Sequence, residues 1–182
     1  MDREYLKPYR CMGGAMLVLD DSPACIALFL ACIQYGMVPV LTTPLSLDAV
    51  LEKGLTTSDA TFLFTSEHKE REGFQDQVYT ITVEKGMKND PLCLTLKNPD
   101  AEIPERFVDA EESAYFLMTS GSSGIPKIVM HSHPAFPDTN QNYAVDTLHI
   151  SDQDRIYSIS KMCFGYGLAN NLFFSLLNGA TA

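Results

Sequence analysis

The sequence predicts a layered α/β fold in which helices flank a mostly parallel β-sheet. Short apolar runs of strand length alternate along the chain with longer apolar segments that carry helix-start and helix-stop residues. A chain of 182 residues with 46% hydrophobic residues is also long enough to bury a substantial core. One domain is therefore the expected organisation.

The first predicted helix has clear signals at both ends. Ser22 offers an N-cap hydroxyl, and Pro23 follows at the first helical position, where a missing N–H is tolerated. We expect the helix to run to Tyr35 and to stop at Gly36, a residue suited to left-handed backbone. Because residues 23–35 are apolar on nearly every side, we expect this helix to be well buried.

The rest of the chain continues the alternation. Ser46 is expected to cap a second helix that ends near Leu55. Residues 78–83 alternate like a strand at an exposed edge, and the polar stretch 84–112 is expected to be mostly loop. The other predicted strands cover residues 16–19, 38–42, 61–65, 114–118 and 155–159. Two more helices are predicted, at residues 134–149 with a start near Asp138 and at residues 168–177 with a stop at Asn178 and Gly179.

Charge and hydropathy exclude several classes of partner. The net charge is −10, so the chain lacks the positive surface needed to bind nucleic acid or an anionic membrane. The longest apolar run, residues 24–33, is too short to span a bilayer. The mixed charges of the first seven residues do not resemble a signal peptide.

The cysteines favour a reducing compartment. The five cysteines contain no C-x-x-C pair, and those at 25 and 32 lie among apolar residues as expected of buried hydrophobic side chains. The set is Cys11, Cys25, Cys32, Cys93 and Cys163. Together with the absence of a targeting signal, this predicts a cytoplasmic location.

Residues 115–127 read Y-F-L-M-T-S-G-S-S-G-I-P-K, a strand pattern that leads into a loop rich in hydroxyls and glycines. Hydroxyls, backbone N–H groups, glycines that allow a sharp turn and one mobile lysine are the groups that bind phosphate. The sequence therefore predicts an anion site, with a solvated turn between two strands as the alternative. The candidate residues are Thr119, Ser120, Gly121, Ser122, Ser123, Gly124 and Lys127.

The sequence of this loop differs from the motifs of other well-known catalytic and phosphate-binding loops. Ile125 and Pro126 stand between the last glycine and Lys127, so it is no Walker A loop, and no G-x-S-x-G elbow is present. Residues 128–130 are apolar and partly β-branched, so we expect a second strand after the loop. A loop between two strands that reads T-S-G-S-S-G-x-P-K resembles the signature of the adenylate-forming enzymes, which include acyl-CoA synthetases, luciferases and peptide-synthetase adenylation domains.

A second segment narrows this resemblance. Within residues 146–182, the pieces T-L-H, S-x-S-K-x-x-F-x-Y-G-L-x-N and G-A-T-A are similar to the aryl-CoA ligase branch, benzoate–CoA ligase in particular. Residues 20–40 are similar to the first helix and second strand of that family. The resemblance implies that residues 1–182 form part of the large N-terminal AMP-binding (adenylation) domain. The family's small C-terminal domain would then be absent, and the fold incomplete.

The resemblance also implies a chemistry. Family members use ATP to convert a carboxylic acid to an acyl-adenylate and then transfer the acyl group to CoA, with Mg²⁺ on the nucleotide. The loop residues from Thr119 to Lys127 would hold the β- and γ-phosphates. The expected partners are a small carboxylic acid and a complementing C-terminal portion. No catalytic residue is assigned within this chain, which is expected to be inactive alone.

Two other functions stay open from the sequence. One is a truncated, inactive homologue that acts as a binding or interaction module. The other is part of an adenylation domain that loads a carrier protein instead of CoA. The particular carboxylic acid is not specified by the sequence.

The acyl-substrate pocket is assigned by resemblance to Phe164, Gly165, Tyr166 and Gly167. The two glycines flank an aromatic ring and would let other groups approach the backbone closely. From composition alone, an aromatic core residue at a glycine bend explains the same segment. Lys161 is expected to pair with an acidic residue or to lie along the helix that follows.

The histidines do not predict a metal site. His131 and His133 are two residues apart and would face the same side of a strand, but no third ligand lies at a suitable spacing. His133 matches a histidine of the family, which implies a structural or pocket-edge role. His68 and His149 are expected to be ordinary surface or core residues.

Overall fold

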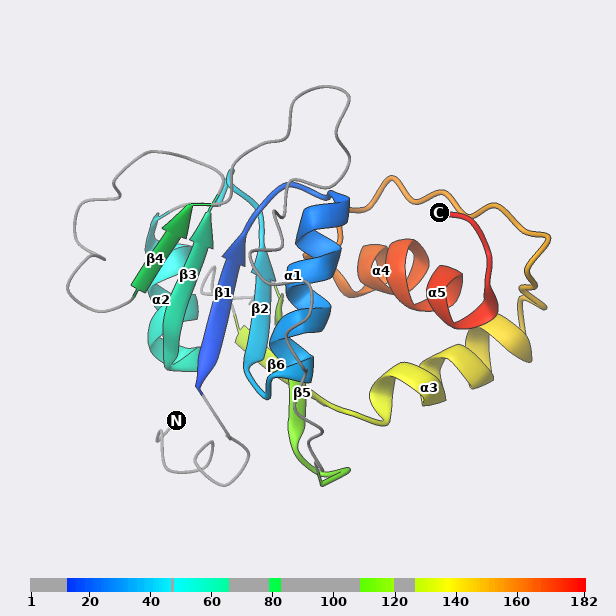
Figure 1. Cartoon of the computed structure of the whole chain (residues 1–182), viewed down its shortest axis with the longest axis horizontal. Coiled ribbons are helices and arrows are strands. Elements are labelled where there is room, and N and C mark those ends of the chain that lie inside the picture. The colour runs from blue at the N-terminus through cyan, green and yellow to red at the C-terminus, as the bar shows by residue number, and fades with distance from the viewer. Residues whose placement is uncertain (1–12, 47, 66–78, 83–108, 120–126) are drawn as a thin grey trace, which may run out of the picture.

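The computed structural model of the chain describes residues 13–46, 48–65, 79–82, 109–119 and 127–182. These residues form a six-stranded sheet with the order β4-β3-β1-β2-β5-β6 (Figure 1). Neighbouring strands are parallel except for β5 and β6, which are antiparallel, so the predicted mostly parallel class is confirmed. The strands are β1 (Gly14–Val18), β2 (Val38–Thr42), β3 (Ala60–Thr65), β4 (Tyr79–Thr82), β5 (Ser113–Thr119) and β6 (Lys127–Ser132).

Helices flank the sheet and extend to one side of it. Two helices connect parallel strands, α1 (Pro23–Gln34) and α2 (Asp48–Ser58). The others are composite and lie to the right of α1 in Figure 1. In them, α3 (Ala135–Thr139) continues into the π-helical stretch η2 (Asn140–Val145), and α4 (Gly165–Leu168) continues through η3 (Ala169–Phe174) into α5 (Ser175–Asn178).

The ends of α1 are those that the sequence predicts. Ser22 has extended backbone, and its Oγ accepts a hydrogen bond of 3.2 Å from the N–H of Cys25. This bond satisfies one of the N–H groups that a helix start leaves without a partner. At the other end Gly36 adopts φ +75°, a left-handed conformation that glycine takes without strain.

Alternating side chains of β1 divide the core into two layers. Ala15 and Leu17 pack with buried residues of α1, whereas Met16 and Val18 pack with Leu51 of α2. Successive side chains on a strand point to opposite faces, so one strand can serve both layers. Figure 1 shows the result, with α1 on one face of the sheet and α2 on the other.

An aromatic cluster joins the sheet to the composite helices. Tyr115 of β5 lies with its ring centroid 5.8 Å from that of Phe29 in α1 and 4.8 Å from that of Phe136 in α3. Phe173 of η3 completes the cluster, 5.7 Å from Tyr115 and 4.0 Å from Phe136. Edge-to-face pairs of this kind contribute beyond the apolar area that they bury. The cluster therefore fixes the C-terminal helices against β5.

Residues 155–159 do not form the predicted strand. Arg155 makes an isolated parallel bridge with Thr181, and no strand follows it. Tyr157 and Ile159 are 87% and 90% exposed. An alternating pattern becomes a strand only where another strand accepts its hydrogen bonds, and within the described residues this segment has no such neighbour.

Several helix boundaries differ from the predicted ones. The helix expected near Asp138 begins at Ala135, because Pro137 lies in its first turn, where proline is tolerated. Helix α2 extends past Leu55 to Ser58, and the helix expected from Leu168 begins at Gly165. Helix α1 is well buried, as predicted. Cys25, Phe29 and Cys32 are fully buried, and its other large apolar side chains are partly buried against the same core: Ile26, Leu28, Leu30 and Ile33.

Candidate active site at the carboxyl edge of the sheet

Three parallel strands end at the same edge of the sheet. Strand β1 pairs with β2, and β2 pairs with β5, in parallel, so their carboxyl ends lie side by side. From β1 the chain crosses to β2 on one side, and from β2 it returns past β1 to β3 on the other. Open α/β sheets bind ligands outside the carboxyl ends of the strands at such a reversal of strand order.

The predicted phosphate loop leaves from this edge. Thr119 is the last residue of β5, Lys127 is the first residue of β6, and the two are register partners in the antiparallel pair. Both are exposed. The prediction that the loop joins two strands is confirmed. The other predicted phosphate ligands, Ser120, Gly121, Ser122, Ser123 and Gly124, lie outside the described residues.

The predicted acyl-pocket residues form a turn at the start of α4. Phe164 has extended backbone, its N–H donates to Lys161 O at 3.0 Å, and its carbonyl accepts from the N–H of Leu168 at 2.9 Å. The side chains of Phe164 and Tyr166 are 56% and 67% exposed. These two rings are therefore presented by a hydrogen-bonded turn and are not core residues. We call residues 160–168 the aromatic turn.

The aromatic turn lies beside β5, close to the start of the loop. A Cβ atom placed on Gly165 would be 3.4 Å from Leu117 Cδ1. Leu117 is two residues before Thr119. The structure thus brings the predicted acyl pocket and the predicted phosphate loop to one edge, although 45 residues of sequence separate Thr119 from Phe164.

Gly167 is required by the turn's own backbone. A Cβ atom at this position would lie 2.1 Å from Lys161 O and 2.4 Å from Ser160 O. Backbone oxygens cannot swing aside like the end of a flexible side chain, so only glycine fits without moving the chain. The sequence predicts that other groups can approach the backbone closely here, and the structure confirms this for Gly167. The groups that approach it are backbone oxygens of the aromatic turn, those of Ser160 and Lys161.

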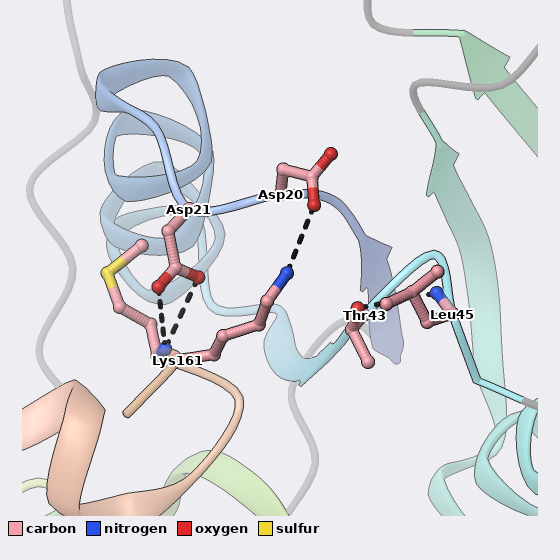
Figure 2. A network of polar contacts seen from close by, with 6 residues as sticks. Asp20, Asp21, Thr43, Leu45 and Lys161 are labelled. Carbon is pink, nitrogen blue, oxygen red and sulfur yellow. Dashed lines mark hydrogen bonds and ion pairs between the residues drawn. The ribbon is translucent and has the colours of Figure 1, made fainter. Parts of the chain in front are cut away.

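Two adjacent aspartates tie the aromatic turn to the end of β1. Lys161 Nζ lies 3.2 Å from Asp20 Oδ1, which confirms the predicted pairing of this lysine with an acid. The N–H of Met162 donates to both carboxylate oxygens of Asp21, at 3.2 and 3.0 Å. Figure 2 shows the two contacts meeting at the carboxyl end of β1. Neither contact is predicted by the sequence, because D-D-S-P signals only a helix start.

The end of β2 adds a hydroxyl-rich turn to the same edge. Thr43 Oγ1 accepts from the N–H of Leu45 at 3.3 Å, and Figure 2 places these residues near the Asp20–Lys161 pair. Thr42 Oγ1 and Ser46 Oγ are 2.6 Å apart, so the turn closes on itself. Leu45 is 82% exposed. This turn has no assigned role, and the sequence predicts only a helix start here.

His131 of β6 packs against an aromatic residue of the core. The ring of His131 is stacked on that of Tyr115, with centroids 4.6 Å apart and an interplanar angle of 2°. Loss of hydration by burial lowers the pKa of His131, so its neutral form is favoured. His133 lies just beyond β6 and is half-buried. Among the described residues, no group of three or more His, Cys, Asp or Glu could hold a metal ion.

The described cysteines are not poised for nucleophilic chemistry. Cys25, Cys32 and Cys163 are buried free thiols, as predicted for the first two. Burial raises the pKa of Cys25 to about 12, with Asp21 as a further cause, and burial alone raises that of Cys32 to about 12. Burial also raises the pKa of Cys163. A reactive cysteine needs the opposite shift.

Comparison with known proteins identifies the family. A family model described as AMP-binding enzyme matches residues 14–182. The chain belongs to the AMP-binding enzyme family. The chain is 31% identical over 173 residues to an anthranilate–CoA ligase of Pseudomonas aeruginosa. This match covers 92% of this chain and 33% of that protein. It is 30% identical over 159 residues to a benzoate–CoA ligase of Thauera aromatica, covering 85% of this chain and 30% of that protein.

Solved structures of AMP-binding enzymes share the fold. A benzoate CoA ligase from Burkholderia xenovorans matches with a TM-score of 0.76 and 26% identity, over 99% of this chain and 37% of that one. An o-succinylbenzoate CoA synthetase from Bacillus subtilis matches with a TM-score of 0.77 and 22% identity, over 98% and 44%. The chain spans about a third of the length of the curated relatives that it matches. Within its described part, no helix is both long and apolar enough to cross a membrane.

Proposed function

We propose that this chain is part of a ligase that activates an aromatic carboxylic acid with ATP and then transfers the acyl group to coenzyme A. The observation that carries the proposal is the position of the aromatic turn. Gly165 lies against Leu117, two residues before the strand end from which the loop departs. An acid bound at Phe164 and Tyr166 would lie near a nucleotide bound at that loop. Similarity to anthranilate– and benzoate–CoA ligases supports an aromatic acid.

On the nucleotide side, we assign the β- and γ-phosphates to the loop from Thr119 to Lys127. Lys127 supplies a cation on an exposed side chain, and the Thr119–Lys127 register pair holds both ends of the loop at one place. A lysine binds phosphate as a point charge, and it offsets the repulsion expected from a chain with a net charge of −10. This local charge supports an anion site within an acidic protein.

On the acid side, we assign the ring of the substrate to Phe164 and Tyr166, with Gly165 and Gly167 shaping the turn. Both aromatic rings are more than half exposed, although aromatic side chains are usually buried. An exposed ring on a rigid turn offers a face for stacking or edge contacts with a second ring. The exposure of the two rings therefore favours a binding role over a packing role.

The reaction requires in-line geometry more than a reactive side chain. One carboxylate oxygen forms a bond to the α-phosphorus of ATP, the bond from that phosphorus to the bridging oxygen breaks, and pyrophosphate leaves with the electron pair. The thiol of CoA then attacks the acyl carbon, and AMP leaves. The chain's part is to hold the phosphates, neutralise their charge and align the acid. Magnesium bound to the phosphates would supply further charge neutralisation.

The domain organisation and the location are also proposals. Residues 1–182 would be part of the large adenylation domain, and a complementing C-terminal portion would complete the enzyme. The coverage of about a third of each relative supports this organisation. A cytoplasmic location is supported by the three buried free thiols, which fit a reducing compartment.

Binding to the purified chain tests the proposal first. Anthranilate is fluorescent, so a change in its emission on titration with the chain measures acid binding directly. A chimera in which residues 1–182 replace the corresponding third of the Pseudomonas ligase then tests turnover, by pyrophosphate exchange that depends on the acid and by CoA thioester formation. We expect binding and exchange with anthranilate or benzoate, and less with an aliphatic acid of equal charge. No binding by a folded chain, together with no exchange by a folded chimera, would overturn the proposal.

A further inference from the structure

Asp21 occupies a fixed place between two well-packed elements. The strand before it, β1, is buried at all five positions. The residue after it, Ser22, is the N-cap of α1 and is hydrogen-bonded to Cys25. The backbone of Asp21 therefore has little freedom, and its carboxylate is presented at a defined point on the carboxyl edge of the sheet.

From that point Asp21 holds the main chain of a distant segment. Both of its carboxylate oxygens accept from the N–H of Met162, across 141 residues of sequence. Met162 is only 2% exposed, so its N–H depends on this acceptor. A hydrogen bond to a carboxylate is stronger than one to a neutral oxygen, and two acceptor oxygens restrict its direction.

The held segment is the base of the aromatic turn. The carbonyl of Lys161, the residue before Met162, accepts from Phe164, and it faces Gly167 at close range. Ser160 O accepts from Asn171 Nδ2 at 3.4 Å, which ties the base to η3. A displacement of Met162 would therefore be passed to the backbone that carries Phe164 and Tyr166.

We propose that Asp21 is a positioning residue, which fixes the aromatic turn through the N–H of Met162 and so sets how tightly the carboxylic acid binds. This inference rests on the proposed function. Asp21 itself contacts neither the rings nor, in our assignment, the substrate. The neighbouring Asp20 differs, because its bond to Lys161 joins two half-exposed side chains and does not hold the backbone. Exposed pairs of that kind contribute little.

The test compares Asp21→Ala, Asp21→Asn and the matched control Asp20→Ala in the full chain. Amide hydrogen exchange over residues 160–168 reports how firmly the aromatic turn is held. Anthranilate fluorescence reports acid affinity, and thermal unfolding reports overall stability. For Asp21→Ala we expect faster exchange at Met162 and anthranilate affinity weaker by at least about tenfold, the lower end of the factor for one charge-assisted hydrogen bond. Asp21→Asn keeps an acceptor oxygen and should recover most of the affinity. Asp20→Ala removes the half-exposed ion pair with Lys161 and should weaken anthranilate binding less than Asp21→Ala does.

The outcomes separate this inference from the proposed function. If the unaltered chain binds anthranilate and Asp21→Ala binds it equally well, the inference fails alone. It also fails if exchange rises equally throughout the chain and the melting temperature falls, because Asp21 would then act on stability only. If the unaltered, folded chain binds no aromatic acid and the folded chimera shows no exchange, the proposed function fails, and the assignment of Asp21 to acid binding fails with it.

Discussion

Replacement of Gly167 by alanine is the sharpest test of the aromatic turn. The added Cβ would lie 2.1 Å from Lys161 O, whereas real Cβ contacts stay beyond 3.0 Å, so the two chain segments must separate by at least about 0.9 Å. Overpacking of this kind costs about 1–3 kcal/mol, and alanine returns up to about 1 kcal/mol through its better helix propensity. We therefore expect Gly167→Ala to lower the free energy of unfolding by about 1–2 kcal/mol.

The neighbouring glycine provides a matched control. Among the described residues, alanine at Gly165 would meet only Leu117 Cδ1, at an ordinary contact distance of 3.4 Å. It occupies the same short helix, so it gains the same helix propensity without the clash. We expect Gly165→Ala to leave the free energy of unfolding within about 1 kcal/mol of that of the unaltered chain.

Urea unfolding followed by far-ultraviolet circular dichroism measures both variants. Anthranilate fluorescence on the same samples should show weaker binding by Gly167→Ala, because displacements near 1 Å at a binding site have large effects. If Gly167→Ala is as stable as Gly165→Ala and binds anthranilate as well as the unaltered chain, the turn is not constrained as we describe and the reasoning is refuted.

Three other changes test separate parts of the molecule. In the chimera, Lys127→Ala should weaken ATP binding by about 1.5–3 kcal/mol through loss of one charge-assisted contact, and unchanged pyrophosphate exchange would contradict this. Because burial lowers the pKa of His131 in the folded chain, its contribution to stability should be complete above pH 6.5 and lost as the pH falls through the lower folded value. Denaturant unfolding from pH 7.5 to 5 should show that loss, and His131→Phe should reduce it. A polypeptide limited to residues 1–182 holds about a third of its relatives' length and should release no AMP coupled to CoA acylation, which a coupled assay would detect.

Local signals in the sequence predicted much of the fold. Ser22 and Gly36 mark the ends of α1, and the apolar runs before Thr119 and after Lys127 mark the two strands that flank the loop. These features depend on residues within a few positions of each other. Residues 155–159 show the limit of local patterns, because a strand forms only where another strand accepts its hydrogen bonds.

The geometry of the site depends on contacts that no local pattern encodes. The bonds from Asp20 and Asp21 to residues 161 and 162 span 141 positions. Without the strand order, the sequence cannot show that the ends of β1 and β5 share an edge with the aromatic turn. The proposed role of Phe164 and Tyr166 rests on the resemblance to a family, whereas their exposure is visible only in the structure.

The pairing of β5 with β6 has a consequence for how the loop can evolve. A shift of register by one residue would turn every side chain of a strand to the other face. Tyr115 and Leu117 are packed into the core on the α1 side, so β5 cannot slip. From Tyr115 to Thr119, β6 is aligned to it residue by residue. The anchor points of the loop are therefore set by aromatic residues several positions away. A substitution deep in the aromatic cluster would therefore displace the ends of the loop without changing any residue of the loop itself.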